Sequence, residues 1–304
     1  MRNAQQNSML LLANPLPSLL FTIVLVFLSS LDAMSGSAKS RREVISVRHA
    51  AIATDDLQCS RIGIDVLREG GNVVDASVVA VLCLGVVNPT SSGLGGRAFM
   101  LIRLASGETR AFDMRETTPL LASENMYAGN ETLKGKGAIS IAIPGELASL
   151  HEAWKQHGRL PWERLVKPTE RLARLGFKIS PYLHMQMVKM KSGILADEGL
   201  HHLFTLNGSL LKTLETCCNM KLAETLSQIS KFGPIAFYNA SIGSKLVRDI
   251  QKLRGILTMK DLQNYKVKLR KPVSADTLGL KILTMPPPSG GHPMIPVSKS
   301  LFLI

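Results

Sequence analysis

An apolar segment at residues 73–87 constrains the fold of this chain more than any other feature of its sequence. The segment, VVDASVVAVLCLGVV, is apolar on nearly every side of a helix and is longer than most strands. Because such a helix has to be surrounded by other elements, it needs a sizeable core, and a chain of 304 residues is long enough to build one. The segment therefore predicts a buried helix that Asn88-Pro89 ends.

Amphipathic helices and apolar strands are predicted on both sides of this segment. Asp55 and Asp56 precede a helix that Gly70-Gly71 ends. A hairpin is predicted over 98–104 and 108–115. The other predicted elements are a strand or buried β-run at 44–54, helices at 146–157, 161–175, 221–232 and 241–254, a helix start at Thr258, and two strands within 266–285. Residues 177–220 receive no assignment, and the whole pattern predicts a mixed α/β domain.

Three parts are predicted along the chain: a targeting segment with a basic spacer at 1–43, a folded domain at 44–291, and a tail at 292–304. The tail, HPMIPVSKSLFLI, has no clear period and ends on apolar residues. We therefore expect a truncated or alternatively spliced reading frame at this end.

The first part has the pattern of a secretory signal. An apolar run at 19–31 follows Arg2, and its length of about 13 residues fits a signal peptide better than a spanning helix. An uncleaved membrane anchor and a buried helix of a cytosolic protein are the alternatives. The sequence also has three N-x-[ST] glycosylation sequons, which begin at Asn130, Asn207 and Asn239. We expect a cell-surface or extracellular location, apoplast or plasma membrane, with the vacuole as the alternative.

The formal net charge is +13, and much of it lies in one stretch. Residues 245–281 carry ten Lys or Arg against three Asp. These basic residues are not interleaved with aromatics, and no nucleic-acid-binding motif accompanies them. The stretch therefore predicts a solvated basic face, and no nucleic-acid partner is expected.

Several common sites are excluded by their context. Gly93-x-Gly95-x-x-Ala98 matches part of a dinucleotide fingerprint, but it precedes a predicted strand, whereas the fingerprint has to open a helix. No two of the seven His residues have metal-ligand spacing with a third ligand nearby. The sequence therefore predicts neither a cofactor nor a metal site.

Four cysteines allow three pairings: Cys59, Cys83, Cys217 and Cys218. A bridge between Cys59 and Cys83 suits an oxidising compartment, whereas the adjacent Cys217 and Cys218 would be strained if bridged to each other. Partly buried free thiols are the alternative for all four.

Arg115 is the one residue with a clear binding chemistry. It lies at the end of a predicted strand, in AFDMRETTP. A guanidinium holds a carboxylate with two parallel hydrogen bonds and stays charged at any pH. The residues alone favour a structural salt bridge to Asp113 or Glu116 over a binding role for Arg115.

An ordered set of motifs resembles the large subunit of γ-glutamyltransferases (glutathione hydrolases), most of all their plant members. The resemblance covers about four fifths of the chain, from about Val47 to Gly291, so that the tail at 292–304 is expected to lie outside the family pattern. Its motifs are ATDDLQCSRIGIDVLREGGNVVDA, LCLGVVNPTSSGLGG, AFDMRETTP, IAIPGELASLHEAWKQHGRLPW, GPIAFYNASIG, GILTMKDLQNYKV and PPPSGG.

This resemblance implies an Ntn-hydrolase, a four-layer α/β/β/α sandwich of which the chain forms the large-subunit part. In that family a precursor cleaves itself, and the freed N-terminal Thr of the small subunit attacks the γ-glutamyl amide of glutathione. Water or an amino acid or dipeptide then takes the glutamyl group. The resemblance also implies that Arg115 binds the glutamyl α-carboxylate and that Cys59 and Cys83 form a disulfide.

Two departures from the family pattern stand out. Arg97 occupies a position where the family usually has Gly, and no Thr-Thr-His-like nucleophile sequence is present, because Pro119 follows Thr117-Thr118. We therefore expect a chain that is inactive alone and lacks its small-subunit partner. The alternatives are a non-catalytic, secreted or anchored glutamyl-binding protein, and another Ntn-type amidohydrolase such as a cephalosporin acylase.

Overall fold

The computed structural model describes residues 47–277 and 279–301. The predicted signal or anchor at 19–31 therefore lies outside the described residues, as does the whole segment 1–43 with its basic spacer. From Ala50 onward the described residues belong to one compact unit. Within the described ranges, no helix is both long enough and apolar enough to cross a membrane.

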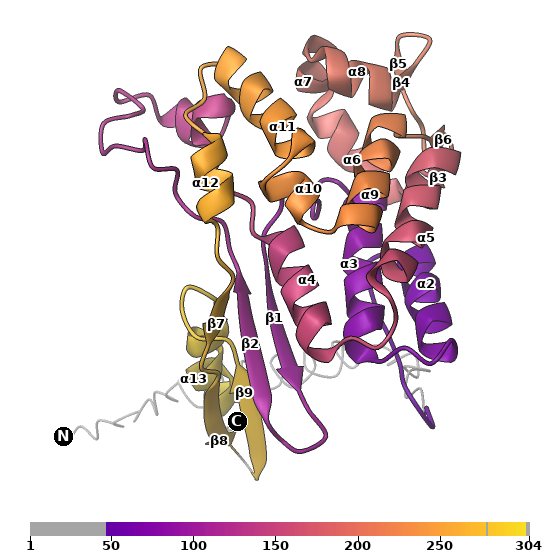
Figure 1. Cartoon of the computed structure of the whole chain (residues 1–304), viewed down its shortest axis with the longest axis vertical. Helices are drawn as coiled ribbons and strands as arrows, with labels where there is room; N and C mark the ends of the chain where they lie inside the picture. The colour runs from indigo at the N-terminus through magenta and orange to yellow at the C-terminus, as the bar shows by residue number, and fades with distance from the viewer. Residues whose placement is uncertain (1–46, 278, 302–304) are drawn as a thin grey trace, which may run out of the picture. The chain divides into compact units, whose positions relative to one another are not determined.

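Helices are the commonest elements of the described chain (Figure 1). The α-helices are α2 (Leu57–Arg68), α3 (Val73–Val87), α4 (Glu146–His157), α5 (Trp162–Leu175), α6 (Pro181–Lys189), α7 (Lys191–Ala196), α8 (Glu198–Phe204), α9 (Met220–Phe232), α10 (Ile235–Tyr238), α11 (Ser241–Lys252), α12 (Met259–Asn264) and α13 (Gly291–Leu301). Two short 3-10 helices are η1 (Glu131–Lys134) and η2 (Ala138–Ser140). Each helix predicted from the sequence is confirmed, with ends shifted by a few residues.

The strands are short and pair antiparallel. They are β1 (Ala98–Arg103), β2 (Thr109–Met114), β3 (Phe177–Lys178), β4 (Thr205–Leu206), β5 (Ser209–Leu210), β6 (Thr216–Cys217), β7 (Lys268–Arg270), β8 (Val273–Thr277) and β9 (Leu280–Thr284). The largest sheet has the order β1-β2-β7. The pairs β3-β6, β4-β5 and β8-β9 are separate.

Helix α3 is the buried helix that the sequence predicts. Asn72 caps its first turn, and Asp75 completes a capping box by accepting the Asn72 backbone N–H. Most of its side chains are buried, and it packs against α2, α4 and α5. The central position of α3 explains why its sequence has no polar face.

The main sheet carries the hairpin that the sequence predicts. β1 and β2 pair from Ala98 opposite Met114 to Arg103 opposite Thr109. Helix α4 packs against β2, whose Phe112 and Met114 are fully buried. The last residue of β2 is therefore held between a helix and a neighbouring strand.

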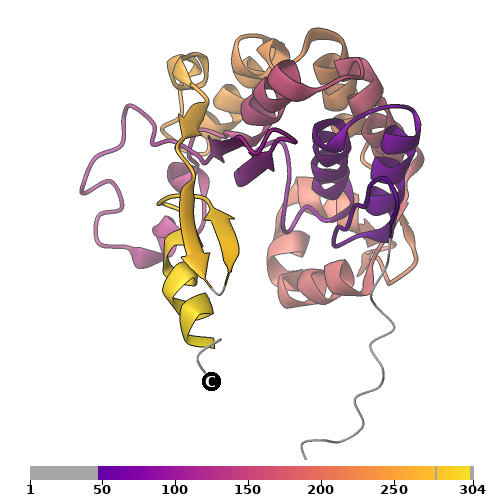
Figure 2. The same ribbon diagram turned by 90° about the horizontal axis from the view of Figure 1, so that it is seen from below.

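Residues 266–285 contain three strands instead of the predicted two. β7 joins β2, while β8 and β9 form a separate hairpin whose register runs from Val273 opposite Thr284. Pro272 separates β7 from β8, since a proline has no N–H to donate to a strand ladder. In the segment 292–304, predicted to lack a regular period, the described residues up to Leu301 are helical as part of α13, which packs on β8 and β9 (Figure 2).

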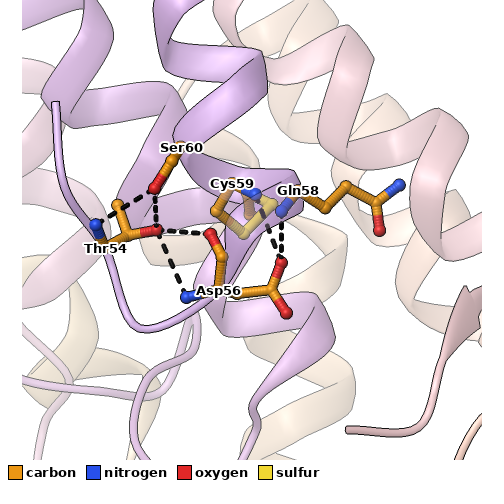
Figure 3. Close-up of a disulfide and its surroundings, with 6 residues drawn as sticks. Thr54, Asp56, Gln58, Cys59 and Ser60 are labelled. Atoms are coloured by element: carbon orange, nitrogen blue, oxygen red, sulfur yellow. Dashed lines mark hydrogen bonds between the residues drawn. A yellow bond between two sulfur atoms is a disulfide. The ribbon is translucent and has the colours of Figure 1, made fainter.

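The strand predicted at 44–54 is wrong, because the described part of that segment has no strand. Its end is held by polar contacts before α2 (Figure 3): Thr54 donates to the Asp56 carbonyl and hydrogen-bonds the Ser60 hydroxyl. The Asp56 side chain then accepts the N–H groups of the first turn of α2. Local capping thus determines the backbone here, despite the apolar residues nearby.

Asp75 connects two distant parts of the chain. Besides its bond to Asn72, its fully buried carboxylate accepts the N–H groups of Arg159 and Leu160, in the turn between α4 and α5. The two oxygens of a carboxyl group can accept from all three of these donors at once. The carboxylate therefore holds α3 against the α4–α5 turn.

We expect Asp75→Ala to lower the free energy of unfolding by roughly 3 kcal/mol, because buried backbone N–H groups would lose their acceptor. Urea unfolding of the chain followed by circular dichroism measures the change. Asp65→Ala is the matched control, since the exposed Asp65 pairs with the exposed Arg68 on the surface of α2, and it should stay within about 0.5 kcal/mol of wild type. Equal effects of the two substitutions would contradict the role given to Asp75.

Candidate functional site

The site lies where β2 ends. Arg115 follows the last residue of β2, and its Nη2 donates to Glu116 Oε1 at 3.0 Å. The same guanidinium lies over the Phe99 ring, 5.7 Å from its centroid. The structural salt bridge considered for Arg115 is thus present, with Glu116 as its acid and not Asp113.

Asp113 has a different role. Its Oδ1 accepts the Arg115 backbone N–H at 3.1 Å, and its Oδ2 accepts from Arg270 of β7 at 3.0 Å. The carboxylate is almost completely buried and is paired. Asp113 therefore fixes the Arg115 main chain and joins it to the edge strand β7.

The segment after β2 is held along its length by other parts of the chain. The Tyr265 hydroxyl donates to the Arg115 carbonyl at 3.1 Å, and Thr117 forms an isolated bridge with Ile143. Farther on, the buried Asp261 accepts the Leu120 N–H at 2.8 Å. Burial alone would raise the pKa of Asp261, but hydrogen bonds from Thr258 and Leu120 outweigh it and lower that pKa. The Arg115 segment is thus a rigid support, although it has no regular secondary structure.

Gly145 permits the close approach of this segment to α4. A Cβ at this position would lie 2.5 Å from the Met114 carbonyl oxygen and 2.7 Å from that of Arg115. No side chain fits in that space. The glycine of the PGE sequence therefore lets the end of β2 rest directly on the start of α4.

A glycine turn lies across a hollow from the Arg115 segment. The segment SSGLGG leads into β1, so the structure confirms that this turn opens a strand and not a helix. The Gly96 carbonyl accepts the N–H groups of Gly145 and Glu146, both at 3.3 Å. A Cβ on Gly96 would lie 2.7 Å from Glu146 Oε2, so the turn and the start of α4 are in direct contact.

The turn and the Arg115 segment enclose a hollow of about 660 Å³. Small residues make up most of the walls, and Arg97, Arg115 and Glu116 supply the charges. The lining residues are Gly85, Pro89, Ser91, Ser92, Gly93, Gly95, Gly96, Arg97, Arg115, Glu116, Ser140, Ile141 and Ala142. Such a space suits a small anionic ligand that binds close to the main chain.

Glu146 lies beneath the glycine turn and is almost completely buried. The Ser92 hydroxyl donates to its Oε1 at 3.3 Å. Burial raises the pKa of Glu146 to about 7, and hydrogen bonds from Ser92 and the Gly93 backbone offset this only in part. Glu146 is not among the site residues predicted from sequence, because its only signal there is an acid directly after Pro-Gly at a helix start.

The other predicted site residues lie apart from the hollow's lining. Cys59 of α2 and Cys83 of α3 form a disulfide, while Cys217 and Cys218 are free. The three sequon residues are exposed: Asn130 precedes η1, Asn207 lies in the β4–β5 turn, and Asn239 follows α10. Among the described residues, no group of three His, Cys, Asp or Glu side chains could hold a metal ion.

Comparison with known proteins shows which family the chain matches. The family profile described as gamma-glutamyltranspeptidase matches residues 59–298, which include the glycine turn, Arg115 and the start of α4. The chain belongs to the gamma-glutamyltranspeptidase family. The match covers the large-subunit portion and reaches into the segment 292–304, while the domain boundaries predicted at 43 and 291 remain predictions.

Similar proteins agree with the family assignment. Glutathione hydrolase 2 of Arabidopsis thaliana is 55% identical over 272 residues, which are 90% of this chain and 47% of that protein. Glutathione hydrolase 3 of the same plant is 47% identical over 273 residues, which are 88% of this chain and 43% of that protein. The chain thus spans about half the length of the curated relatives it matches.

A solved structure shows the fold. The crystal structure of Helicobacter pylori gamma-glutamyltranspeptidase superposes with a TM-score of 0.80 at 32% identity, covering 83% of this chain and 74% of that chain. The chain therefore has the α/β fold of the Ntn-hydrolase gamma-glutamyltranspeptidases, as the sequence predicts. The helices around α3 and the sheet β1-β2-β7 belong to the large-subunit part of that sandwich.

The ionisation of Glu146 should make the stability of the chain depend on pH. Its pKa is about 7 in the folded chain and 4.5 as the ordinary value. Between these values the unfolded chain holds fewer protons than the folded chain, so stability falls as pH rises, by roughly 3 kcal/mol in total. Urea unfolding of wild type and Glu146→Gln from pH 4 to pH 8 tests this, because the Gln variant lacks this contribution. Parallel stability curves would show that the buried carboxyl does not titrate as stated.

Proposed function

We propose that this chain supplies the donor-binding part of an enzyme that cleaves the γ-glutamyl amide of glutathione and passes the glutamyl group to water, an amino acid or a dipeptide. One observation carries the proposal: the main chain of Arg115 is held at the end of β2, and Arg115 is among the residues that line a hollow of mostly small residues. A guanidinium in that position can hold the α-carboxylate of a glutamyl donor with charge-assisted hydrogen bonds. The glycine turn opposite leaves room for the donor's main chain.

Binding alone does not cleave an amide. The family resemblance implies that the nucleophile is an N-terminal Thr whose own α-amino group serves as the base. Thr117 and Thr118 cannot fill that role, because their nitrogens are peptide amides, and the Thr117 N–H donates to the Ile143 carbonyl. We therefore propose that residues 1–304 do not turn over by themselves and that catalysis needs the small-subunit portion.

We also propose that the protein enters the secretory pathway and acts at the cell surface or outside the cell. The apolar run at 19–31 supports this proposal, as do three exposed sequon residues. In an oxidising compartment the Cys59–Cys83 disulfide would persist. The γ-glutamyl compounds of that compartment would then be the substrates.

Substitution of Arg115 tests the binding role. In a reconstituted enzyme containing this chain, Arg115→Gln should lower kcat/KM for γ-glutamyl-p-nitroanilide by about 100-fold, because charge-assisted hydrogen bonds to the donor are lost. Arg115→Lys should recover only part of the activity, since an ammonium lacks the planar fork. The matched control is Arg110→Gln, at the other end of β2, where Arg110 pairs with the exposed Glu108. Equal losses at both positions would argue against a donor-binding role for Arg115.

Complementation tests whether catalysis needs the small-subunit portion in addition to this chain. The chain alone should release no p-nitroaniline at an enzymatic rate, whereas addition of the remaining portion of the 55%-identical Arabidopsis relative should restore release. Turnover by the chain alone would refute the need for a second portion. Failure to restore activity with folded partners would favour a non-catalytic glutamyl-binding protein.

A further inference from the structure

Arg97 and Arg115 share one carboxylate at the open end of the β1–β2 hairpin. The register ends with Ala98 opposite Met114, and Arg97 and Arg115 are the next residues of the chain at that end of the two strands. Like charges close together on paired strands repel each other. Glu116 relieves the repulsion, because its Oε1 accepts from Arg97 Nη1 at 2.9 Å and from Arg115 Nη2 at 3.0 Å.

The charge of this cluster depends on Arg97. Arg115 and Glu116 together are neutral, and the nearby carboxylate of Asp113 is already paired with Arg270. Arg97 therefore brings the three charged side chains that line the hollow, Arg97, Arg115 and Glu116, to a net charge of +1. One unit of positive charge is the complement of one carboxylate.

The geometry around Glu116 also suits a second carboxylate. Both guanidinium groups already lie within hydrogen-bond distance of a single oxygen atom, and a guanidinium has five N–H donors. Among the described residues, Glu116 is the one acid within ion-pair distance of Arg97. The Arg97 side chain is 57% exposed, so it can turn toward a ligand without breaking other contacts of the fold.

We propose that Arg97 acts beside Arg115 as a second guanidinium that binds the donor's α-carboxylate. It would make this chain select more strongly for glutamyl compounds whose α-carboxylate is free and ionised. The inference rests on the proposed function, which places that carboxylate at Arg115. Because Arg97 is exposed, its contribution is modest and falls as salt concentration rises.

Binding of L-glutamine tests the role of Arg97 directly. L-Glutamine carries an α-carboxylate and a neutral side-chain amide, like a γ-glutamyl donor, whereas L-glutaminamide lacks the carboxylate. Isothermal titration of the full 304-residue chain should show that Arg97→Gly and Arg97→Gln each raise the Kd for glutamine roughly fivefold at low salt. Arg97→Lys should retain part of the affinity, and Arg110→Gly, which removes an exposed Arg–Glu pair elsewhere in β2, should leave the Kd unchanged.

The outcomes separate this inference from the proposed function. An unchanged Kd in both neutral Arg97 variants, with binding lost in Arg115→Gln, would overturn the role of Arg97 and leave that of Arg115 intact. An Arg97 effect that is equal for glutamine and glutaminamide would also overturn it, because the side chain would then not recognise the carboxylate. A wild-type chain that does not bind glutamine, or an Arg115→Gln chain that binds it as wild type does, would overturn both.

Discussion

The burial of α3 is the constraint on which the rest of the structure depends. A helix without a polar face is stable only when neighbours cover most of its surface, and α2, α4 and α5 provide that cover. The disulfide fixes α2 to this helix, and the Asp75 carboxylate fixes the α4–α5 turn to its first residues. Because α4 also packs on β2, the end of that strand is placed by the same core.

The candidate site is assembled from segments that are far apart in sequence. Arg115 and Glu116 come from the end of β2, the glycine turn precedes β1, and Tyr265 and Asp261 come from the region of α12. Each contact acts on the main chain of the Arg115 segment and leaves its guanidinium available in the hollow. The segment is thus ordered by hydrogen bonds to its backbone and not by a strand or helix of its own.

Much of this fold could be predicted from sequence because its signals are local. The apolar run of α3, the capping residues of α2 and the turn between β1 and β2 each specify their own element. The separation of β7 from β8 was missed because pairing with β2 depends on a distant strand. Arg115 could be found from its chemistry and context, whereas the burial of Glu146 and the sharing of Glu116 by two arginines arise only when the turn, the hairpin and α4 meet.

The start of α4 is linked to the site in an unusual way. The residue before this helix, Gly145, has no side chain to cap it, and the Gly96 carbonyl of the glycine turn accepts the first amides instead. The amide of Glu146 can therefore exchange its hydrogen with solvent only when the turn moves away. Deuterium uptake by the Glu146 amide therefore measures how often the glycine turn moves away from the start of α4.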